Sequence, residues 1–513
     1  MIRKKSLTFL LFMILALLVA ACSSNDTIAP VSSFEFPPDQ IFYNSTSSLA
    51  ETPMVRFVGT AEDNVWVNTV KMSFDDGITW VDAVIEGQGA RVSWYYEAMS
   101  SELMTISVIQ VRAADLNGNV EMTGASQPYT KIDGTTTTDL QDLVNNAGTA
   151  STNDTIYLSS GAEGAYGNTG ANGLVLANTN PIVIVGNGFD QTIAVGGASA
   201  IIATSKTFLA TSQSAPSLIS AGDDLYLRSL RLIGGEVGAL ASANGPIQVA
   251  VDDCAIAGFK GWGVKAEDLN GGGDVLVMVT GSLIDASEAN NVTIRHGGIL
   301  LDDVLFDVNG SVVMNHNTPS GNDSGLYISG GSGTVSGSYF SANRNAIWVH
   351  NSSPVIDSCN VVGDPVVANT GIFYGGGSSG LLSNSLIDGN KGFGVKIEGM
   401  SYPTLYGNTI SNNTEWGVVL EGDFGTTNLP NLGNTTMSAP GNGLNSFLSN
   451  TAPSYVNANI LVTSSSLGGT IIPAQNNWWG TANVNIVGSS IVDGTTWGGT
   501  VPIINFSVRT TPP

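Results

Sequence analysis

Basic residues are scarce in this chain. Its 513 residues contain 18 Lys and Arg against 42 Asp and Glu, and the net charge is −24. Three of the basic residues lie among the first five positions, and only ten fall after position 133. Because nucleic-acid binding depends on basic side chains that neutralise phosphates, this balance argues against a nucleic-acid partner. An acidic surface instead suits solubility, divalent cations and neutral partners.

Cysteine and histidine are also rare, with three residues of each. The sequence has no His and Cys spacing of the kind that holds zinc. It also lacks a phosphate-binding glycine loop, the Gly-x-Ser-x-Gly turn of serine hydrolases and a glycine-rich calcium nonapeptide. Glycine is abundant, with 62 residues, and many Asn, Ser and Thr residues accompany it. This composition indicates a turn-rich β-protein rather than a helical one.

An apolar run from Leu7 to Ala21 follows the basic start of the chain. It is short for a membrane span, which takes about 20 apolar residues, and its pattern is typical of an export signal. The run closes on Val19-Ala20-Ala21-Cys22, which resembles the bacterial lipobox. The resemblance implies that Cys22 is lipidated and becomes the mature amino terminus; a plain signal peptide is the alternative. Ser23 rather than aspartate follows, which by the same resemblance favours the outer membrane or cell surface of a Gram-negative cell.

Residues 1–22 are therefore predicted to be a lipoprotein signal peptide, and the lipid is the only expected contact with a membrane. Residues 23–50 are rich in Ser, Thr, Asn and Pro. Since such a composition cannot bury a core, we predict a flexible tether there.

Residues 51–133 show the pattern of a small β-sandwich. Short alternating segments at 54–58, 69–74 and 106–112 are separated by the turn signals Asp76-Gly77 and Asn117-Gly118-Asn119. The runs SFDDGITW and VRAADLNGNV resemble those of bacterial Ig-like modules. The resemblance implies a spacer or an adhesive unit.

Residues 134–513 carry an internal repeat. Four consecutive segments begin AIWVH, GIFYG, GVKIE and GVVLE. The first residues of the repeats are Gly263, Gly298, Gly325, Ala346, Gly371, Gly394 and Gly417, spaced by 21 to 27 residues apart from one interval of 35. Short strands with period-2 alternation at this spacing predict a β-solenoid, in which each repeat is one coil.

The two ends of this region resemble a known superfamily. A short helix predicted at 138–144, followed by NDTIYLSSGAEGAYG and NPIVIVGNGFDQTIAV, resembles the entry of pectin-lyase-like proteins. The closing NNWWGTANVNIVG resembles the last coils of bacterial parallel β-helix repeat proteins. The resemblance implies an all-β chain in which a right-handed single-stranded parallel β-helix follows the Ig-like sandwich. It implies a fold, not an activity.

A second column of the repeat consists of small residues that we expect to face inward. Its members are Cys254, Ser282, Ser311, Ser338, Cys359, Ser385 and Asn408. An oxidising compartment would permit a disulfide between the two cysteines. However, they lie four coils apart in this column, and at about 4.8 Å per coil they are too distant to bond. We therefore predict two buried free thiols.

Two outward columns offer candidate binding residues. Two residues after the start of each coil, Tyr327, Trp348 and Phe373 follow one another, and sugar rings stack on aromatic faces of this kind. Two residues further on, the column is mostly acidic and contains His350 and Glu398. It could hold a cation or bind sugar hydroxyls. The alternatives are a loop that covers the aromatic residues and a merely solvated acidic face.

The turn before each coil offers the candidate catalytic residues His296, Asp323 and Arg344, on consecutive coils. Such a trio can supply a base, an orienting charge and a stabiliser of a developing anion; ordinary surface turns are the alternative. In the resembling families, lyases use an Arg or Lys base, often with calcium, and hydrolases use clustered aspartates. Calcium is therefore a candidate cofactor. The Asn-Thr-Asp, Gly-His-Gly and Arg-Ile-Lys motifs of those enzymes are absent, and the pair Asp302-Asp303 lacks their setting.

Two hypotheses follow for the function. In the first, a surface lipoprotein recognises polysaccharide through the β-helix face and, if it is an enzyme, acts as a polysaccharide lyase or glycoside hydrolase. In the second, it is a non-catalytic adhesive or structural surface protein with the Ig-like module as spacer. The scarcity of Lys and Arg in the β-helix argues against a lyase for anionic polysaccharides and favours a neutral glycan or the second hypothesis.

Overall fold

A computed structural model gives the structure of the chain. It describes residues 26–36, 40–44, 53–99, 108–131, parts of 154–243, 245–286, 297–316, 323–364, 369–422, 424, 428–434, 443–455, 457–463, 470–496 and 503–512. The chain divides into two compact units, one of residues 1–133 with 152–157 and the other of residues 134–151 with 158–513. The predicted signal peptide with Cys22 and the predicted helix at 138–144 lie outside the described residues. Within those residues, no helix is long and apolar enough to cross a membrane.

The N-terminal unit contains two sets of antiparallel strands. One has the order β1-β3-β7-β6 and the other the order β9-β8-β4-β5, with β2 parallel to β9. The strands are β1 (Val31–Phe36), β2 (Gln40–Asn44), β3 (Pro53–Glu62), β4 (Val67–Ser73), β5 (Val81–Asp82), β6 (Val84–Glu86), β7 (Arg91–Met99), β8 (Val108–Asp115), β9 (Ser126–Lys131) and β10 (Asp154–Leu158). The predicted turn at Asp76-Gly77 is present, and both residues have positive φ.

An aromatic core holds these sheets together. Burial alternates along β8, so that one face of the strand is covered and the other is not. Phe57 and Trp94, both fully buried, belong to one sheet. Phe74, which directly follows β4 of the other sheet, meets Phe57 edge to face at 5.9 Å between ring centroids. The two sheets therefore pack face to face as a small sandwich; its Ig-like identity stays a prediction. The flexible tether predicted at residues 23–50 does not hold for β1 and β2, because β1 pairs with β3 and β2 pairs with β9.

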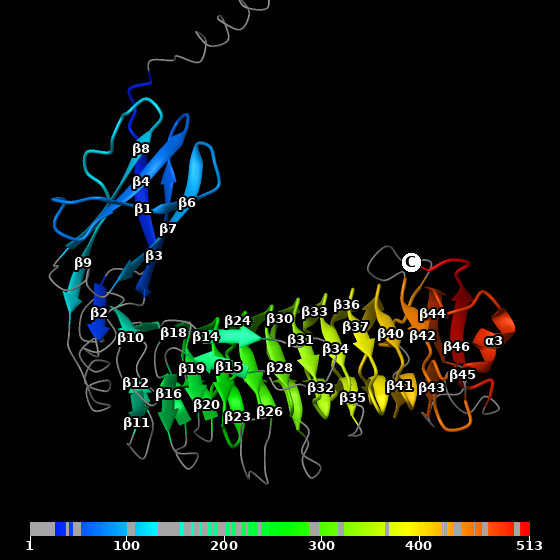
Figure 1. Cartoon of the computed structure of the whole chain (residues 1–513). Helices are drawn as coiled ribbons and strands as arrows, with labels where there is room; N and C mark the ends of the chain where they lie inside the picture. Colours follow the sequence, from blue (N-terminus) through cyan, green and yellow to red (C-terminus); the bar gives the residue numbers. More distant parts are fainter. Residues whose placement is uncertain are drawn as a thin grey trace, which may run out of the picture. The chain divides into compact units, whose positions relative to one another are not determined.

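The second unit is a parallel β-helix (Figure 1). Each coil contributes one strand to each of three parallel sheets, whose strands stack along one axis. Sheet 1 contains β12 (Leu174–Leu176), β17 (Ser217–Ala221), β20 (Val237–Ala243), β23 (Trp262–Asp268), β26 (Gly297–Asp302), β29 (Ser324–Ser329), β32 (Asn345–His350), β35 (Thr370–Gly375), β38 (Phe393–Glu398), β41 (Trp416–Glu421), β43 (Ile460–Val462) and β45 (Ile491–Val492).

The other two sheets have shorter strands. Sheet 2 contains β13 (Ile182–Val185), β18 (Leu225–Arg228), β21 (Ile247–Asp252), β24 (Val275–Thr280), β27 (Leu305–Asn309), β30 (Ser332–Ser336), β33 (Val355–Asp357), β36 (Leu381–Ser383) and β39 (Thr404–Tyr406). Sheet 3 contains β11 (Tyr166–Asn168), β16 (Phe208–Thr211), β19 (Arg231–Ile233), β22 (Ala255–Ala257), β25 (Leu283–Asp285), β28 (Val312–Met314), β31 (Tyr339–Ser341), β34 (Asn360–Val362), β37 (Leu386–Asp388), β40 (Thr409–Ser411) and β42 (Ser446–Leu448).

Four further strands and one helix complete the description of this unit. They are the antiparallel pair β14 (Phe189–Thr192) and β15 (Ile202–Ser205), the parallel pair β44 (Ile471–Asn477) and β46 (Ile503–Val508), and α3 (Val484–Ser489). Asn483 caps α3 by accepting from two backbone N–H groups at the start of the helix.

Close contact between coils explains the glycine column of the repeat. The predicted first residues of the coils occupy the second position of the sheet 1 strands from β23 to β41. A Cβ atom on Gly394 would lie 2.6 Å from the carbonyl oxygen of Gly417 on the next coil, and one on Gly298 would lie 2.5 Å from that of Gly325. A side chain at such distances would crowd the next coil, so glycine is favoured where the coils turn into sheet 1; Ala346, at the same position of β32, shows that a single methyl group is accommodated on one coil.

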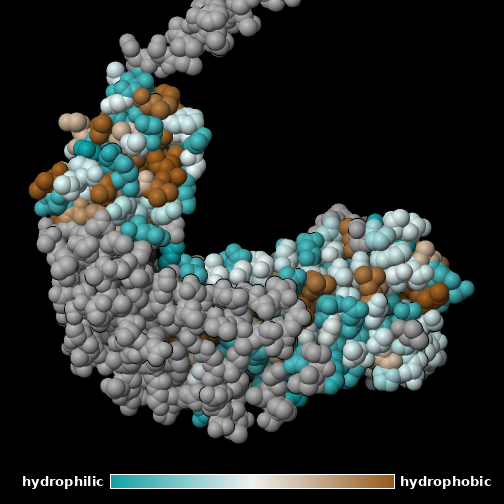
Figure 2. Space-filling view, in the orientation of Figure 1, coloured by the Kyte–Doolittle hydropathy of each residue, from teal (hydrophilic) through white to brown (hydrophobic). Residues whose placement is uncertain are grey.

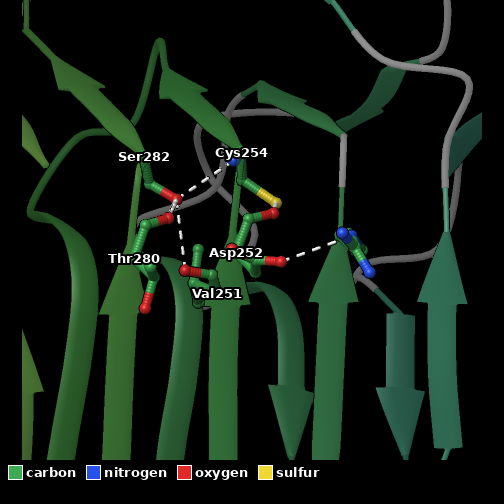
Figure 3. Close-up of polar contacts among 6 residues, drawn as sticks. Val251, Asp252, Cys254, Thr280 and Ser282 are labelled. Atoms are coloured by element: carbon green, nitrogen blue, oxygen red, sulfur yellow. Dashed lines mark hydrogen bonds and ion pairs between the residues drawn. The ribbon is translucent and has the colours of Figure 1, made fainter. Parts of the chain in front are cut away.

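The predicted inward column forms a hydrogen-bonded ladder between sheets 2 and 3. The hydroxyl of Ser282 accepts from Cys254 N at 3.0 Å and lies within 3.1 Å of the Val251 and Thr280 carbonyl oxygens, to either of which it can donate (Figure 3). The side chains of Ser311, Ser338, Ser385 and Asn408 accept from the neighbouring coil in the same way. Asn445 and Asn477 extend this ladder beyond the residues that the sequence predicted.

The ladder also confirms the prediction for the cysteines. Cys254 and Cys359 are both buried and free. Burial raises the pKa of the Cys254 thiol to about 12 and that of Cys359 to about 11. Both thiols are therefore protonated and inert near neutral pH.

A second ladder lies where sheet 3 turns into sheet 1. This asparagine ladder consists of Asn343, Asn390, Asn413 and Asn450. Asn413 Oδ1 accepts from Asn390 N at 3.0 Å, and Asn450 Oδ1 accepts from Asn413 N at 3.2 Å. At these two corners, between sheets 2 and 3 and between sheets 3 and 1, buried polar side chains thus form hydrogen bonds with backbone groups.

Candidate functional site

The outward face of sheet 1 brings the predicted aromatic residues together. Tyr327 pairs with Trp348 and Trp348 with Phe373 in the parallel register of β29, β32 and β35. Lys265 and Leu300 precede this column, and Lys396 and Val419 continue it. The predicted register is therefore confirmed, and the three aromatic side chains lie on consecutive coils.

The rings contact one another rather than presenting free faces. Trp348 and Phe373 stack at 5.2 Å between centroids with an angle of 27° between the planes, and Tyr327 meets Trp348 edge to face at 5.1 Å. Lys396 Nζ lies 5.2 Å from the centroid of Phe373. Since these faces are covered by neighbours, a ligand on sheet 1 would meet mainly ring edges and polar atoms. Face-on stacking of a sugar on each ring, expected from the sequence, does not fit this geometry.

Lys396 is neutralised by two glutamates. Its ammonium group lies 2.8 Å from Glu421 and 3.6 Å from Glu398, and its side chain is 21% exposed. Lys265 makes a similar pair with Glu267 at 2.8 Å. The acidic column of sheet 1 is thus partly balanced by the two lysines of the neighbouring column.

A groove crosses β32, β35 and β38 on this face. Its volume is about 290 Å³, close to the lower end of ligand-site volumes. Its lining residues are Arg344, Asn345, Trp348, Asn369, Thr370, Phe373, Gly392, Phe393, Lys396 and Glu415. The groove therefore combines the predicted aromatic column with members of the predicted turn column, and it follows the axis of the β-helix.

The two described members of the predicted catalytic trio, Asp323 and Arg344, do not meet in the groove. Arg344 lines it, but Asp323 is only 1% exposed, and His296 lies outside the described residues. Asn345 N donates to the main-chain oxygen of Asp323, and Thr370 N donates to that of Arg344, so the turns stack in register. A carboxylate as buried as Asp323 is poorly placed to meet a substrate.

His350 and Glu398, predicted to bind substrate, lie beside the groove and do not line it. The ring of His350 covers Gly376, where an added Cβ atom would lie 2.6 Å from the imidazole. Glu398 is engaged by Lys396. Tyr327 also lies outside the lining, and burial, together with the charge of Asp302, raises the pKa of its hydroxyl. Tyr327 is therefore protonated at neutral pH.

The described lining of the groove contains one carboxylate and one unsatisfied polar donor. Among the described lining residues Glu415 is the only carboxylate, whereas glycosidases use a pair. The indole N–H of Trp348 is buried and has no acceptor among the described residues. An unsatisfied buried donor of this kind costs about 1–3 kcal/mol.

Sequence reasoning missed several lining residues. Asn345, Thr370 and Phe393 are the first residues of β32, β35 and β38, where the chain turns the corner into sheet 1. Asn369 and Glu415 stand in the same turn column as Arg344. Their position in that column was the sequence signal that could have identified Asn369 and Glu415 as lining residues.

Comparison with known proteins agrees with the fold. Residues 303–461 match the family model described as right handed beta helix region. With its three parallel sheets, this region has the fold that the family model describes, a parallel β-helix; the resemblance to the pectin-lyase-like superfamily stays a prediction. No curated protein matches it.

Three solved structures illustrate the likeness. The A-module of mannuronan C-5 epimerase AlgE4 from Azotobacter vinelandii is 13% identical, with 64% of this chain and 92% of that chain covered and a TM-score of 0.37. The GH87 α-1,3-glucanase of Streptomyces thermodiastaticus strain HF3-3 is 12% identical, with 77% of this chain and 87% of that chain covered and a TM-score of 0.29. The family 28 exopolygalacturonase of Yersinia enterocolitica is 10% identical, with 95% of this chain and 100% of that chain covered and a TM-score of 0.25. At such TM-scores the likenesses assign no activity to this chain.

Proposed function

We propose that this protein is an exported lipoprotein that binds a neutral polysaccharide in the sheet 1 groove without cleaving it. The observation that carries the proposal is the groove itself, which Arg344 and Trp348 of one coil line together with Phe373 of the next. Amide, hydroxyl and guanidinium groups beside aromatic edges match the mixed polar and apolar surface of a sugar chain.

Charge favours a neutral ligand over an anionic one. Lys396 is occupied by Glu398 and Glu421, and Glu415 adds another carboxylate to the lining. A polyanion would meet these glutamates on a chain whose net charge is already −24. A neutral glycan has no such penalty.

The test uses soluble protein that starts at Ser23, incubated with neutral and acidic polysaccharides with and without calcium. Retention is measured by affinity electrophoresis, and cleavage by reducing ends and by the ultraviolet absorbance of unsaturated products. We expect retention on a neutral glycan, weakened about tenfold or more in Trp348→Ala, which corresponds to about 1.4 kcal/mol. Trp348→Phe preserves the ring stack but removes the N–H. Tyr402→Ala, an exposed aromatic residue outside the groove, is the matched control.

The outcomes separate the functional classes. Retention that depends on Trp348 but not on Tyr402, without products, supports a binding protein. Products that disappear in Arg344→Gln would overturn the non-catalytic assignment and make the groove an active site. Neither retention nor products on any glycan would leave the adhesive or structural surface protein, the second candidate, which the mutually covered ring faces favour.

The lipid anchor has its own test. Cells that express the full chain are labelled with a radioactive fatty acid and fractionated. We expect label in the membrane fraction for the natural sequence and none in Cys22→Ala. Equal labelling of both proteins would contradict lipidation at Cys22.

A further inference from the structure

Three aspartates converge in the N-terminal unit, far along the sequence from the groove residues. Asp26 precedes β1, Asp63 follows β3, and Asp115 ends β8. One carboxylate oxygen from each lies within 4.8 Å of the others. Asp115 is only 3% exposed, and the other two side chains are half-buried.

Hydrogen bonds hold all three carboxylates but leave one oxygen of Asp26 and one of Asp63 without a partner. Asp26 Oδ1 accepts from Ile28 N and Asn64 Nδ2, and Asp63 Oδ2 accepts from Val65 N and Trp66 N. The remaining oxygens, Asp26 Oδ2 and Asp63 Oδ1, are buried and have no hydrogen-bond partner. Buried carboxylate oxygens without a partner need a cation or a proton.

Asp115 is the third carboxylate of the cluster, and hydrogen bonds hold it in place. Its Oδ1 accepts from Asn117 N and Asn119 N, and its Oδ2 accepts from Asn119 Nδ2 at 2.7 Å. Asn119 Nδ2 also donates to the main-chain oxygen of Asp26 at 2.8 Å, which ties the segment before β1 to the end of β8. Burial opposes ionisation of Asp115, but the hydrogen bonds from Asn119 and Asn117 outweigh it and lower its pKa.

Among the described residues of this unit, no ion pair joins a basic side chain to the three carboxylates. Lys71 pairs with Asp82, and Arg91 pairs with Glu62. Negative groups held this close without a counter-charge repel one another. A cation bound from solution would remove this repulsion.

We propose that Asp26, Asp63 and Asp115 form a calcium site that fastens the segment before β1 to the sandwich. The ligands are oxygen atoms alone, which hard cations prefer. A separation of 4.8 Å is no more than twice a Ca–O bond of about 2.4 Å, so the oxygens can share one ion. Calcium accepts irregular oxygen sets completed by water, whereas magnesium demands a tighter octahedron.

This site has a mechanical role that does not depend on glycan binding. Asp26 stands four positions after Cys22, the predicted lipid attachment point. A bound calcium ion would hold the segment before β1 against the ends of β3 and β8. The unit would then be stiffer near its attached end when calcium is present.

The experiment uses soluble protein that starts at Ser23, freed of metal by EGTA, with calcium titrated by calorimetry and thermal unfolding followed with and without calcium. We expect one calcium ion per chain and a higher Tm of the N-terminal unit in calcium. Asp63→Asn and Asp26→Asn should each weaken binding about tenfold or more, and the double variant should abolish it. Asp76→Asn, an exposed aspartate in a turn of the same unit, is the matched control.

Circular dichroism of each variant without metal shows whether the fold is retained; Asp26 lies outside the strands, so Asp26→Asn should fold. Absence of calcium binding at millimolar concentration, or equal binding by the double variant and the natural protein, would overturn the proposal. Magnesium binding with no response to calcium would overturn the identity of the ion. Glycan retention is measured separately, so failure of the groove and failure of this site are distinguishable.

Discussion

Equivalent residues of successive coils stack on one another both at the inward corners and in the outward groove of the β-helix, but the two places differ in burial and hydrogen bonding. At the corners, polar side chains such as Asn408 and Asn413 are fully buried and bonded to the next coil. In the groove, Trp348 and Phe373 are half-buried, and the indole N–H lacks an acceptor among the described residues. Repetition inside the coil pairs polar side chains with the backbone of the next coil, whereas repetition outside leaves aromatic edges for a ligand.

The difference separates stability from function. A change in a ladder should affect folding and leave the groove chemistry alone, because the ladder residues do not reach the surface. A change in the groove should affect binding more than folding. Four substitutions test this separation.

Asn413→Ala should destabilise the β-helix most. The side chain accepts from Asn390 N and Asn390 Nδ2 and donates to Asn450 Oδ1. With each orphaned group costing about 1–3 kcal/mol, we expect a loss of about 3–5 kcal/mol. Denaturant unfolding measures it, with the exposed neighbour Thr414→Ala as control. Equal unfolding midpoints for the two variants would contradict the role of the ladder.

Gly394→Ala should cost less but remain clear. The new Cβ would lie 2.6 Å from the Gly417 carbonyl oxygen and 2.7 Å from Asn413 Nδ2. Crowding of this kind typically costs about 1–3 kcal/mol. Gly245→Ala, where nothing lies within 4 Å of the added atom, should be neutral or slightly stabilising. A neutral Gly394→Ala would show that the coils can separate at this corner.

Cys359 should make stability fall at alkaline pH. Burial raises the pKa of its thiol from 9.0 to about 11, so the folded state keeps a proton that the unfolded state releases. The stabilisation is complete below pH 9 and is lost as pH rises toward 11, by about 1.4 kcal/mol at pH 10. Unfolding midpoints at pH 8 and pH 10 should therefore differ more for the natural protein than for Cys359→Ala. The same difference in both proteins would contradict burial of the thiol.

Lys396→Met should have the smallest effect on stability. Its partners Glu398 and Glu421 are almost half exposed, and pairs of this kind contribute about 0.2–1 kcal/mol. The loss should shrink further at high salt. A large, salt-independent loss would show that Lys396 is part of the core rather than of the groove.

Repetition decided how much the sequence could predict. Seven coils gave the register of sheet 1, so the stacking of Tyr327, Trp348 and Phe373 and the separation of the two cysteines followed directly. The asparagine ladder was missed, although each member stands three residues after a buried apolar residue, as Asn413 does after Ile410. This three-residue spacing was present in the sequence, but the asparagines stand beside loops of variable length, which hid the column.

Other features could not be predicted from the columns of equivalent residues in successive coils. The orientation of Trp348 toward Phe373 depends on side-chain rotamers, which the repeat does not encode. The burial of Asp323 depends on how the coil turns before β29. The aspartate cluster joins three separate loops of the sandwich, where no repeat relates Asp26 to Asp63 and Asp115.

The most direct test of the account compares Trp348→Ala with Asn413→Ala in one affinity-electrophoresis experiment, alongside their unfolding midpoints. The account predicts that Trp348→Ala loses retention on the bound glycan while keeping most of its stability. It predicts that Asn413→Ala keeps its retention at low temperature while losing stability. Retention unchanged in Trp348→Ala would contradict the groove as the binding site.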